Sequence, residues 1–512
     1  MTRIPFADLP QTSALFLDYV RDWTGIPRFY PRSYSVESIA AFARERPRPD
    51  DAHCRRLCSA LRQQQKNWGG SADASLEKLA SGAAVVITGQ QCGLFTGPLY
   101  AILKAITAIK LAGQLEKAGV PAVPVFWIAA EDHDYEEIRW ASVLDRDSGV
   151  RKLQVDLTNG DSAPAGWLRF RDDVREVISR CIESLPQSEF QADVRDLLES
   201  SHRPGASPAE AFARMLSVLF SQKNLVVANP LDEELKRMAA PVLTEAARRN
   251  SEIRRAVLAR SKALSAAGYH EQVRVDDNFT GLFAYRGHSR RALLPGELQG
   301  ELTLSPNVLL RPAVQDAIFP TAAYVGGPAE IAYFAQAAAV YESLGRPVPP
   351  VFPRISATVI EARVSRQMKK YGLEFPDVLG GREHLKRKAV ASVHDVELFD
   401  RIRDKIVAEI DSAGPALSAV DATLLGSLET SRQKIVHQVE SLRTKFVNAQ
   451  AKRNETLERH LDAISSSLFP EKKLQERVIN VTSFLVRYGF GFIGLLEESL
   501  SLDSKEHQVV EI

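Results

Sequence analysis

The feature that most constrains the fold is a pattern of alternating apolar and helical segments within residues 83–134. Residues 83–88 form a short apolar run followed by glycine, which is typical of a buried strand. Residues 99–117 have the apolar spacing of a helix packed on a sheet, and residues 122–130 are a second apolar run. Parallel strands joined by a helix bring their carboxyl ends to one sheet edge. We therefore predict an α/β fold in which the ends of both strands face one crevice.

Composition excludes several classes of protein. The 512 residues allow two or three domains, and 45% apolar with 25% charged residues is ordinary for globular proteins. A net charge of +1 argues against a dedicated nucleic-acid binder. Four cysteines imply no disulfide framework, and no apolar stretch approaches the roughly 18 residues of a membrane span. We therefore expect a cytoplasmic protein with no nucleic-acid and no membrane partner.

The chain divides into a long first part and a different last third. Residues 1–384 are predicted to form an α/β core with a parallel sheet, with insertions at about 140–220 and 270–311. Residues 319–354 repeat the pattern of strand, glycine turn, helix and strand. This repeat indicates either two half-sheets facing one cleft or ordinary α/β succession. Residues 476–512 are expected to pack on the core or on the arm that precedes them.

That arm, residues 385–475, has few strand signals and many long charged side chains. Leu428, Ile435, Leu442 and Ala449 repeat every seven residues, which predicts a coiled coil. Arg432 and Arg453 interrupt the apolar seam, so an antiparallel hairpin is also compatible with it. The seam is covered either by a second copy of the chain, which makes a homodimer, or by the protein's own core.

The glycine-rich turn is the first candidate for ligand binding. Its sequence is Gly-Gln-Gln-Cys-Gly-Leu-Phe-Thr-Gly-Pro at residues 89–98, directly before the predicted helix. Glycines allow close approach of the backbone, and a helix N-terminus attracts phosphate or carboxylate groups. The alternative is a tight turn without a ligand. The candidate binding residues are Gln90, Gln91, Thr96, Gly97, Tyr100 and Lys104.

A cluster of ionisable residues follows the second strand: Glu131, Asp132, His133 and Asp134. His133 is predicted to be a general base or the partner of a substrate carboxylate, with Asp132 or Asp134 beside it. Adjacent strand residues point to opposite faces, so these side chains cannot all converge, and no metal site is predicted. The alternatives are a divalent cation held by some of these acids and a solvated acidic loop.

Two later segments add candidates. Arg311 follows the apolar end of residues 305–310, where an arginine is suited to clamp a carboxylate or phosphate. Asn307 in the same segment is a candidate substrate-binding residue. Glu330, after a Gly-Gly-Pro turn, is placed to recognise an amine. The alternatives are a surface arginine beside a proline turn and an acid favourably placed in the first turn of a helix.

Several segments resemble the bacillithiol-biosynthesis cysteine-adding enzymes. They include Ile-Thr-Gly-Gln-Gln-Cys-Gly-Leu-Phe-Thr-Gly-Pro-Leu-Tyr at residues 87–100 and Pro-Val-Phe-Trp-Ile-Ala-Ala-Glu-Asp-His-Asp at residues 124–134. Residues 305–312, 324–331 and 349–354 match as well. The resemblance implies a Rossmann-like core related to class I aminoacyl-tRNA synthetases, and a C-terminal α-helical coiled-coil domain that forms a homodimer.

The reaction implied by this resemblance is the addition of L-cysteine to the amine of glucosaminyl-malate, the last step of bacillithiol biosynthesis. Activation of the cysteine carboxylate implies ATP or another nucleotide. In this scheme Thr96, Gly97 and Lys104 contact phosphate or carboxylate, His133 with Asp132 or Asp134 orients or deprotonates the amine, and Arg311 clamps malate. Class I synthetases carry His-x-Gly-His where this chain has Phe-Thr-Gly-Pro at residues 95–98. The alternative is therefore a non-catalytic assembly or carrier protein with a degenerate synthetase-like cleft.

Overall fold

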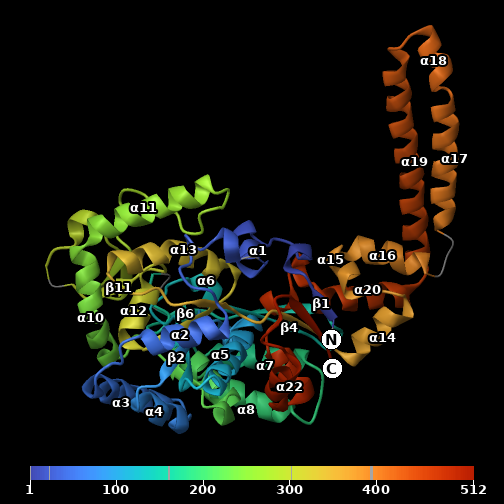
Figure 1. The fold of residues 1–512 in the computed structure, drawn as a ribbon. Helices are drawn as coiled ribbons and strands as arrows, with labels where there is room; N and C mark the ends of the chain where they lie inside the picture. Colours follow the sequence, from blue (N-terminus) through green and yellow to red (C-terminus); the bar gives the residue numbers. More distant parts are fainter. Residues whose placement is uncertain (1, 22, 159–161, 301, 393–395) are drawn as a thin grey trace. The chain divides into compact units, whose positions relative to one another are not determined.

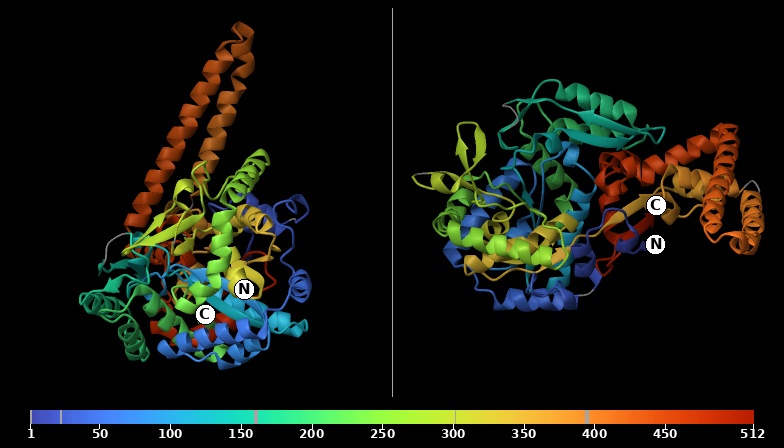
Figure 2. Two further views of the ribbon diagram at one scale, coloured as in Figure 1. Left: turned by 90° about the vertical axis from the view of Figure 1, so that its left-hand side faces the viewer. Right: turned by 90° about the horizontal axis from the view of Figure 1, so that it is seen from above.

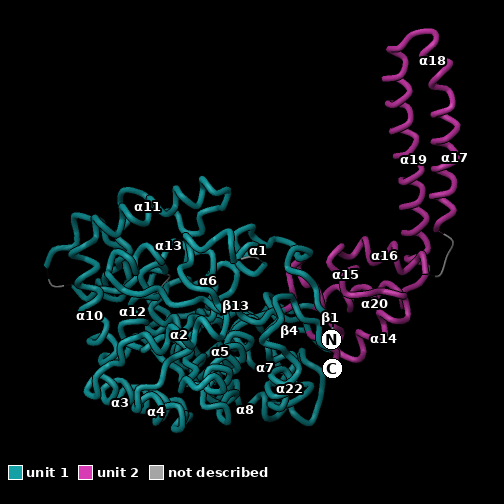
Figure 3. Tube along the Cα trace, viewed as in Figure 1, with its two compact units in different colours: residues 1–146, 150–358, 476–510 teal, residues 147–149, 359–475, 511–512 magenta. Residues whose placement is uncertain are grey.

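The computed structural model describes residues 2–21, 23–158, 162–300, 302–392 and 396–512. The chain divides into two compact units, coloured separately in Figure 3. The first unit contains residues 1–146, 150–358 and 476–510, and the second contains residues 147–149, 359–475 and 511–512. The sequence places the start of the helical part near residue 385, whereas the structure divides the chain near residue 359. Residues 476–510 belong to the first unit.

A five-stranded parallel sheet forms the centre of the first unit (Figure 1). Its strands, in spatial order, are β13 (Val351–Pro353), β12 (Thr321–Gly326), β2 (Ala84–Gln90), β3 (Ala122–Ile128) and β8 (Val226–Ala228). Four of them are fully or almost fully buried, as expected for a parallel sheet covered on both faces. The predicted Rossmann-like α/β core is confirmed.

The neighbouring positions of β2 and β3 confirm the central prediction from the sequence. The strands pair in parallel from Ala84 with Ala122 to Gln90 with Ile128. Helix α5 (Tyr100–Lys117) connects them and packs on both. Strand β2 continues to Gln90, two residues beyond the predicted end, so Gly89 lies within the sheet. A Cβ atom at Gly89 would lie 2.7 Å from the Trp127 carbonyl oxygen, which explains the need for glycine.

The second strand–helix–strand repeat belongs to the same sheet. Strand β12 pairs with β2, and α13 (Pro328–Ser343) leads from β12 to β13. The repeat therefore extends one continuous sheet, and the two half-sheets are not separate. From the central pair β2 and β12, the chain proceeds to β3 on one side and to β13 on the other. This reversal is the topological switch point at which open α/β sheets bind ligands.

The insertions surround this core, and Figure 2 shows them in teal-green and yellow-green. The first contains the hairpins β4–β5 (Trp140–Leu144, Val150–Gln154) and β6–β7 (Leu157–Thr158, Arg169–Phe170). It continues with α7 (Val174–Ser184), α8 (Gln191–Ser201) and α9 (Pro208–Leu219). The second contains the predicted antiparallel strands β9 (Leu282–Arg286), β10 (Ser289–Ala292) and β11 (Leu304–Pro306). The remaining helices of the first unit include α1 (Ala14–Arg21), α2 (Val36–Glu45), α3 (Asp51–Asn67), α4 (Asp73–Ala80), α6 (Tyr135–Ile138), α10 (Glu233–Arg248), α11 (Asn250–Ala266), α12 (Arg311–Ile318), α21 (Thr482–Tyr488) and α22 (Gly491–Ser499).

The second unit is mainly helical, and its long hairpin matches the predicted arm. Helices α17 (Glu397–Ser412) and α19 (Leu424–Lys452) lie side by side, joined through α18 (Gly414–Val420) (Figure 1). Asp400 pairs with Arg443 at 3.1 Å, and Asp411 pairs with Arg432 at 3.4 Å. The start of α17 thus meets the end of α19, so the hairpin is antiparallel. The unit also contains α14 (Ala362–Lys370), α15 (Phe375–Leu379), α16 (Arg382–Ala391) and α20 (Glu455–Leu468).

Candidate active site

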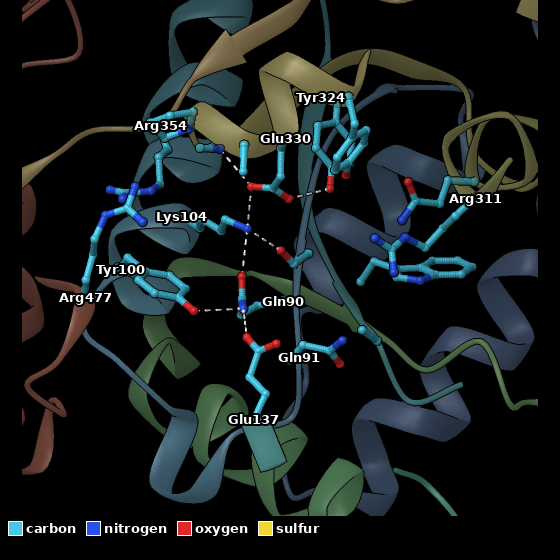
Figure 4. A pocket seen from close by; sticks show the side chains of 18 residues that line it. Gln90, Gln91, Tyr100, Lys104, Glu137, Arg311, Tyr324, Glu330, Arg354 and Arg477 are labelled. Carbon is cyan, nitrogen blue, oxygen red and sulfur yellow. Dashed lines mark hydrogen bonds and ion pairs between the residues drawn. The ribbon is translucent and has the colours of Figure 1, made fainter. Parts of the chain in front are cut away.

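A cavity of about 260 Å³ lies at the carboxyl ends of β2, β3 and β12, at the switch point of the sheet (Figure 4). Residues of β2, β3, β12, α5, α6, α12 and α13 line it, together with one residue that follows β13 and one residue of the returning C-terminal segment. Its polar and charged side chains are Gln90, Gln91, Tyr100, Lys104, Glu137, Arg311, Gln315, Tyr324, Glu330, Tyr333, Arg354 and Arg477.

Lys104 and Glu330 form the central ion pair of the cavity, with 2.6 Å between Nζ and Oε2. The Lys104 ammonium also donates to the Gly89 carbonyl at 2.7 Å and to Gln90 Oε1 at 2.8 Å. Burial lowers the pKa of Lys104, and Glu330 opposes this shift. Glu330 also accepts from the Tyr324 hydroxyl and the Gly327 backbone N–H. All three donors of Lys104 therefore bind protein oxygens, and its role is to hold Gln90 and Glu330 in place.

Glu137 faces the cavity with far fewer partners than Glu330. Among the described residues its carboxylate accepts one hydrogen bond, from Gln90 Nε2 at 3.3 Å, and the same amide donates to the Tyr100 hydroxyl at 3.1 Å (Figure 4). Burial raises the pKa of Glu137 to about 7, and the charges of Asp134 and Asp132 add to this shift. A carboxyl group with this pKa exchanges protons readily near neutral pH.

Arg311 marks a second part of the cavity, where several buried polar atoms have no protein partner. Gln315 is only 1% exposed, yet neither its amide oxygen nor its amide nitrogen has a hydrogen-bond partner among the described residues. The same holds for Gln91 Oε1. Unpaired buried polar atoms are costly, so their presence in a cavity indicates that a polar ligand or water satisfies them.

Arg354 and Arg477 form the opposite end of the cavity. Arg354 is buried and donates from both Nη atoms to the buried carboxylate of Glu476, at 3.0 and 2.6 Å. Glu476 also accepts from Ser356 Oγ and from the Ala357 N–H. Burial alone raises the pKa of Glu476, but the charge and hydrogen bonds of Arg354 outweigh it, so the pKa is lowered. Arg354 is therefore held rigidly in its charged form.

Six of the binding residues predicted from the sequence line the cavity: Gln90, Gln91, Tyr100, Lys104, Arg311 and Glu330. Thr96 and Gly97 do not. Their turn is buried, with positive φ angles at both residues, and Asn480 Nδ2 donates to the carbonyls of Phe95 and Gly97. The turn therefore packs against the segment that contains Asn480, and Thr96 and Gly97 do not contact this cavity.

The predicted catalytic cluster lies beside the cavity and does not line it. Asp132 accepts from Gln91 Nε2 at 2.6 Å and lies 3.8 Å from Arg311. His133 lies 3.3 Å from Arg290 Nη1, and Asp134 caps the N-terminus of α6. Asn307 likewise serves its own chain, because its side chain accepts from the Leu309 and Leu310 N–H groups. Asp132 contacts the side chains of cavity residues, and Asp134 accepts from the backbone N–H of Glu137.

Sequence reasoning counted Glu137 only among the acids that follow His133, and it assigned no role to Gln315, Tyr324, Tyr333, Arg354 or Arg477. One signal was available for Arg354, because it follows a predicted apolar strand, as Glu131 follows another. No local signal points to Arg477, which comes from a segment more than 120 residues after Arg354.

In the parts of the chain that the structure describes, no three histidine, cysteine or acidic side chains are arranged to hold a metal ion. No helix of the described residues has the length and apolar character needed to cross a membrane.

Comparison with known families agrees with this architecture over the whole chain. The description "Bacillithiol biosynthesis BshC, N-terminal Rossmann-like domain" matches residues 2–302 and 298–355. The description "Bacillithiol biosynthesis BshC, C-terminal coiled-coil domain" matches residues 357–512. The chain belongs to the BshC family. The family resemblance read from the motifs is thereby confirmed, and the family's own domain boundary near residue 356 lies close to the division between the two units.

Individual relatives match from end to end. A protein of Koribacter versatilis is 36% identical, with 99% of both chains covered. A protein of Salinibacter ruber is 34% identical, covering 100% of this chain and 98% of the relative. Both are named "Putative cysteine ligase BshC". Among solved structures, a "putative arginyl t-RNA synthetase" from Campylobacter jejuni matches with 10% identity and a TM-score of 0.23, covering 86% of this chain and 97% of that one. A TM-score this low does not establish a shared fold.

Proposed function

We propose that this protein is a cytoplasmic ligase that joins the carboxyl group of L-cysteine to the amine of glucosaminyl-malate, in the last step of bacillithiol biosynthesis. The observation that carries the proposal is the cavity at the switch point of the sheet. It combines a carboxyl group that titrates near neutrality, cationic side chains at both ends and buried polar atoms that lack protein partners. The names of the relatives support the reaction class.

In the proposed reaction the acceptor amine attacks the carbonyl carbon of an activated cysteine. The new C–N bond forms while the bond between that carbon and the leaving-group oxygen breaks, and the leaving group takes the electron pair. The nitrogen must lose a proton. Glu137 is the cavity acid with a free acceptor position, whereas three protein donors already bind Glu330. We therefore assign the proton-accepting role to Glu137.

In this proposal the residues around His133 do not touch the reacting atoms and act through residues that line the cavity. Asp132 binds Gln91 directly and lies near Arg311, so it is placed to orient two residues that line the cavity. His133 and Arg290 flank Asp132 on its other side. Asp132 and His133 are positioning residues in this proposal, and Arg311 with Gln315 and Tyr333 binds the amino-acid substrate.

The proposal includes ATP or another nucleotide as a co-substrate, because a free carboxylate does not form an amide at a useful rate without activation. The glycine-rich turn does not fit a phosphate site: Thr96 and Gly97 are buried against Asn480, and Lys104 has no unused donor. The nucleotide would therefore have to use other cations of the cavity.

The purified full-length protein, supplied with cysteine, glucosaminyl-malate and ATP, is expected to form the cysteinyl amide and to release AMP or ADP. Mass spectrometry of the thiol product and chromatography of the nucleotides measure both. If no amide forms with ATP, with other nucleotides or with chemically activated cysteine, the ligase proposal fails and the assembly or carrier function becomes the better explanation.

We further propose that the chain forms a homodimer through the helical hairpin of α17 and α19. The two helices cannot cover their apolar seam alone. Leu442 is 58% exposed, Leu425 is 41% exposed and Ile402 is 37% exposed. A row of exposed apolar side chains on a long hairpin favours contact with a second copy.

Replacing Leu425 and Leu442 together by glutamate is expected to convert the dimer into a monomer, because two charges would be buried in the apolar seam. Sedimentation equilibrium measures the change against a chain mass of 56.6 kDa. The control is Lys445→Glu, an exposed position on the same helix that should leave the dimer intact. A wild-type protein that sediments as a monomer at micromolar concentration would contradict the homodimer.

A further inference from the structure

We propose that Arg354 and Arg477 form the subsite that binds the two carboxylates of the malyl group of the acceptor. This inference rests on the proposed function and deepens it, because the sequence pointed to Arg311 for malate. It assigns the two ends of the cavity to different substrates: the arginine pair takes the dicarboxylate of the acceptor, and the Arg311 end takes the amino acid.

The first support is the rigid placement of Arg354. Its guanidinium donates to both oxygens of Glu476 and to the Ile355 carbonyl, which occupies three of its five N–H groups. Two donors remain, and the guanidinium lies 5.5 Å from the centre of the Tyr100 ring, beside the cavity. A cation fixed in this way binds an anion without losing further side-chain entropy.

The second support is the missing partner of Arg477. No carboxylate of the described residues lies within ion-pair distance of its guanidinium, although the side chain lines the cavity and points toward Arg354 (Figure 4). Arg477 is exposed to water, yet the partial burial of its guanidinium and the charge of Arg354 lower its pKa. Glu476 already pairs with Arg354, and the other acid that acts on Arg354, Glu330, already pairs with Lys104. A bound anion would relieve this repulsion.

The chemistry of the pair favours carboxylates. Each guanidinium presents a planar set of donors that matches a carboxylate, and two guanidinium groups match the two carboxylates of a malyl group. The position also suits the rest of the acceptor. Tyr100 lies next to Arg354, and Gln90 joins Tyr100 to Glu137. A malyl group at the arginine pair therefore directs the attached amino sugar toward the proposed proton acceptor.

The test compares ligands with and without the malyl group by isothermal titration calorimetry on the full-length protein. Arg477→Gln is expected to weaken the binding of glucosaminyl-malate by about 10- to 100-fold, the size of one or two lost charge-assisted hydrogen bonds. The binding of methyl glucosaminide and of cysteine should change less than about threefold. Arg477→Lys should recover part of the loss, because the charge remains but the planar donor set does not. Arg175→Gln, an exposed charge change on α7, is the matched control.

Calorimetry needs no turnover, so this test is separate from that of the ligase reaction. Selective loss of malyl binding in Arg477→Gln supports the subsite even if no amide is ever formed. Equal affinity of the wild type and Arg477→Gln for glucosaminyl-malate overturns it, as does the absence of wild-type binding. Parallel titrations with inorganic phosphate and ADP test the other source of anionic oxygens. If Arg477→Gln weakens only those ligands, the pair is a phosphate site and the malyl assignment is wrong.

Discussion

Replacing Glu137 by glutamine is expected to lower kcat by about 100- to 10,000-fold, the contribution typical of a general base. Glutamine keeps the shape of the side chain but cannot accept the proton. In the wild type, kcat should rise with pH up to about 7 and then level off, because Glu137 must be ionised to act and burial raises its pKa to about 7. The charges that face it are Asp132, Asp134, Lys104 and Glu330. The variant should lack this rise.

The control for this variant is Glu136→Gln, because Glu136 is the neighbouring residue and its side chain is 79% exposed. It should leave kcat and its pH profile unchanged.

The raised pKa of Glu137 also has a consequence for stability. Ionisation of the buried carboxylate destabilises the folded protein. This destabilisation is absent below the ordinary carboxyl pKa, grows as pH rises toward 7, and is complete above 7, where the buried group is ionised. Glu137→Gln should therefore be more stable than the wild type at pH 8, by an amount of the order of 1 kcal/mol, but not at pH 4. A Glu137→Gln protein with full kcat would rule out the base assignment.

Replacing Glu476 by alanine is expected to destabilise the first unit by about 3–5 kcal/mol. The Glu476 side chain is 1% exposed and that of Arg354 is 5% exposed, so the change leaves a buried cation without its partner. All five tryptophans belong to the first unit, and tryptophan fluorescence during urea unfolding therefore reports on that unit. The lowered pKa of Glu476 means that its stabilisation is present above the ordinary carboxyl pKa and is lost as pH falls through the folded-state value. The difference between the two proteins should therefore shrink in acid.

The comparison for this variant is Glu45→Ala. Glu45 pairs with Arg32 at 2.7 Å, nearly the same distance as the 2.6 Å of the Arg354–Glu476 pair, but its side chain is 57% exposed. Exposed ion pairs contribute at most about 1 kcal/mol, so this variant should unfold close to the wild-type midpoint. Similar losses in both variants would show that burial is not what makes the Arg354–Glu476 pair important.

Only some residues of the candidate site could be predicted from the local sequence. Gln90, Gln91, Lys104 and Glu330 could be predicted because each lies at or near the carboxyl end of a parallel strand, and parallel strands share that edge. Thr96 and Gly97 follow the same strand but turn inward, because Asn480, far along the chain, binds the carbonyls of their turn. The sequence identified Thr96 and Gly97 as turn residues, but the direction in which the turn points depends on its contact with Asn480.

The sequence by itself determined the parallel α/β core and the long helical arm, because the spacing of apolar residues fixes the type of each element locally. Only the tertiary structure decided which ionisable groups share the cavity. Glu137 faces it while His133 turns toward Arg290, and Arg477 joins Arg354 only because residues 476–510 return to the first unit. The physical reason is that side-chain direction and burial depend on what packs against an element, and the packing partners here come from segments far apart in the sequence.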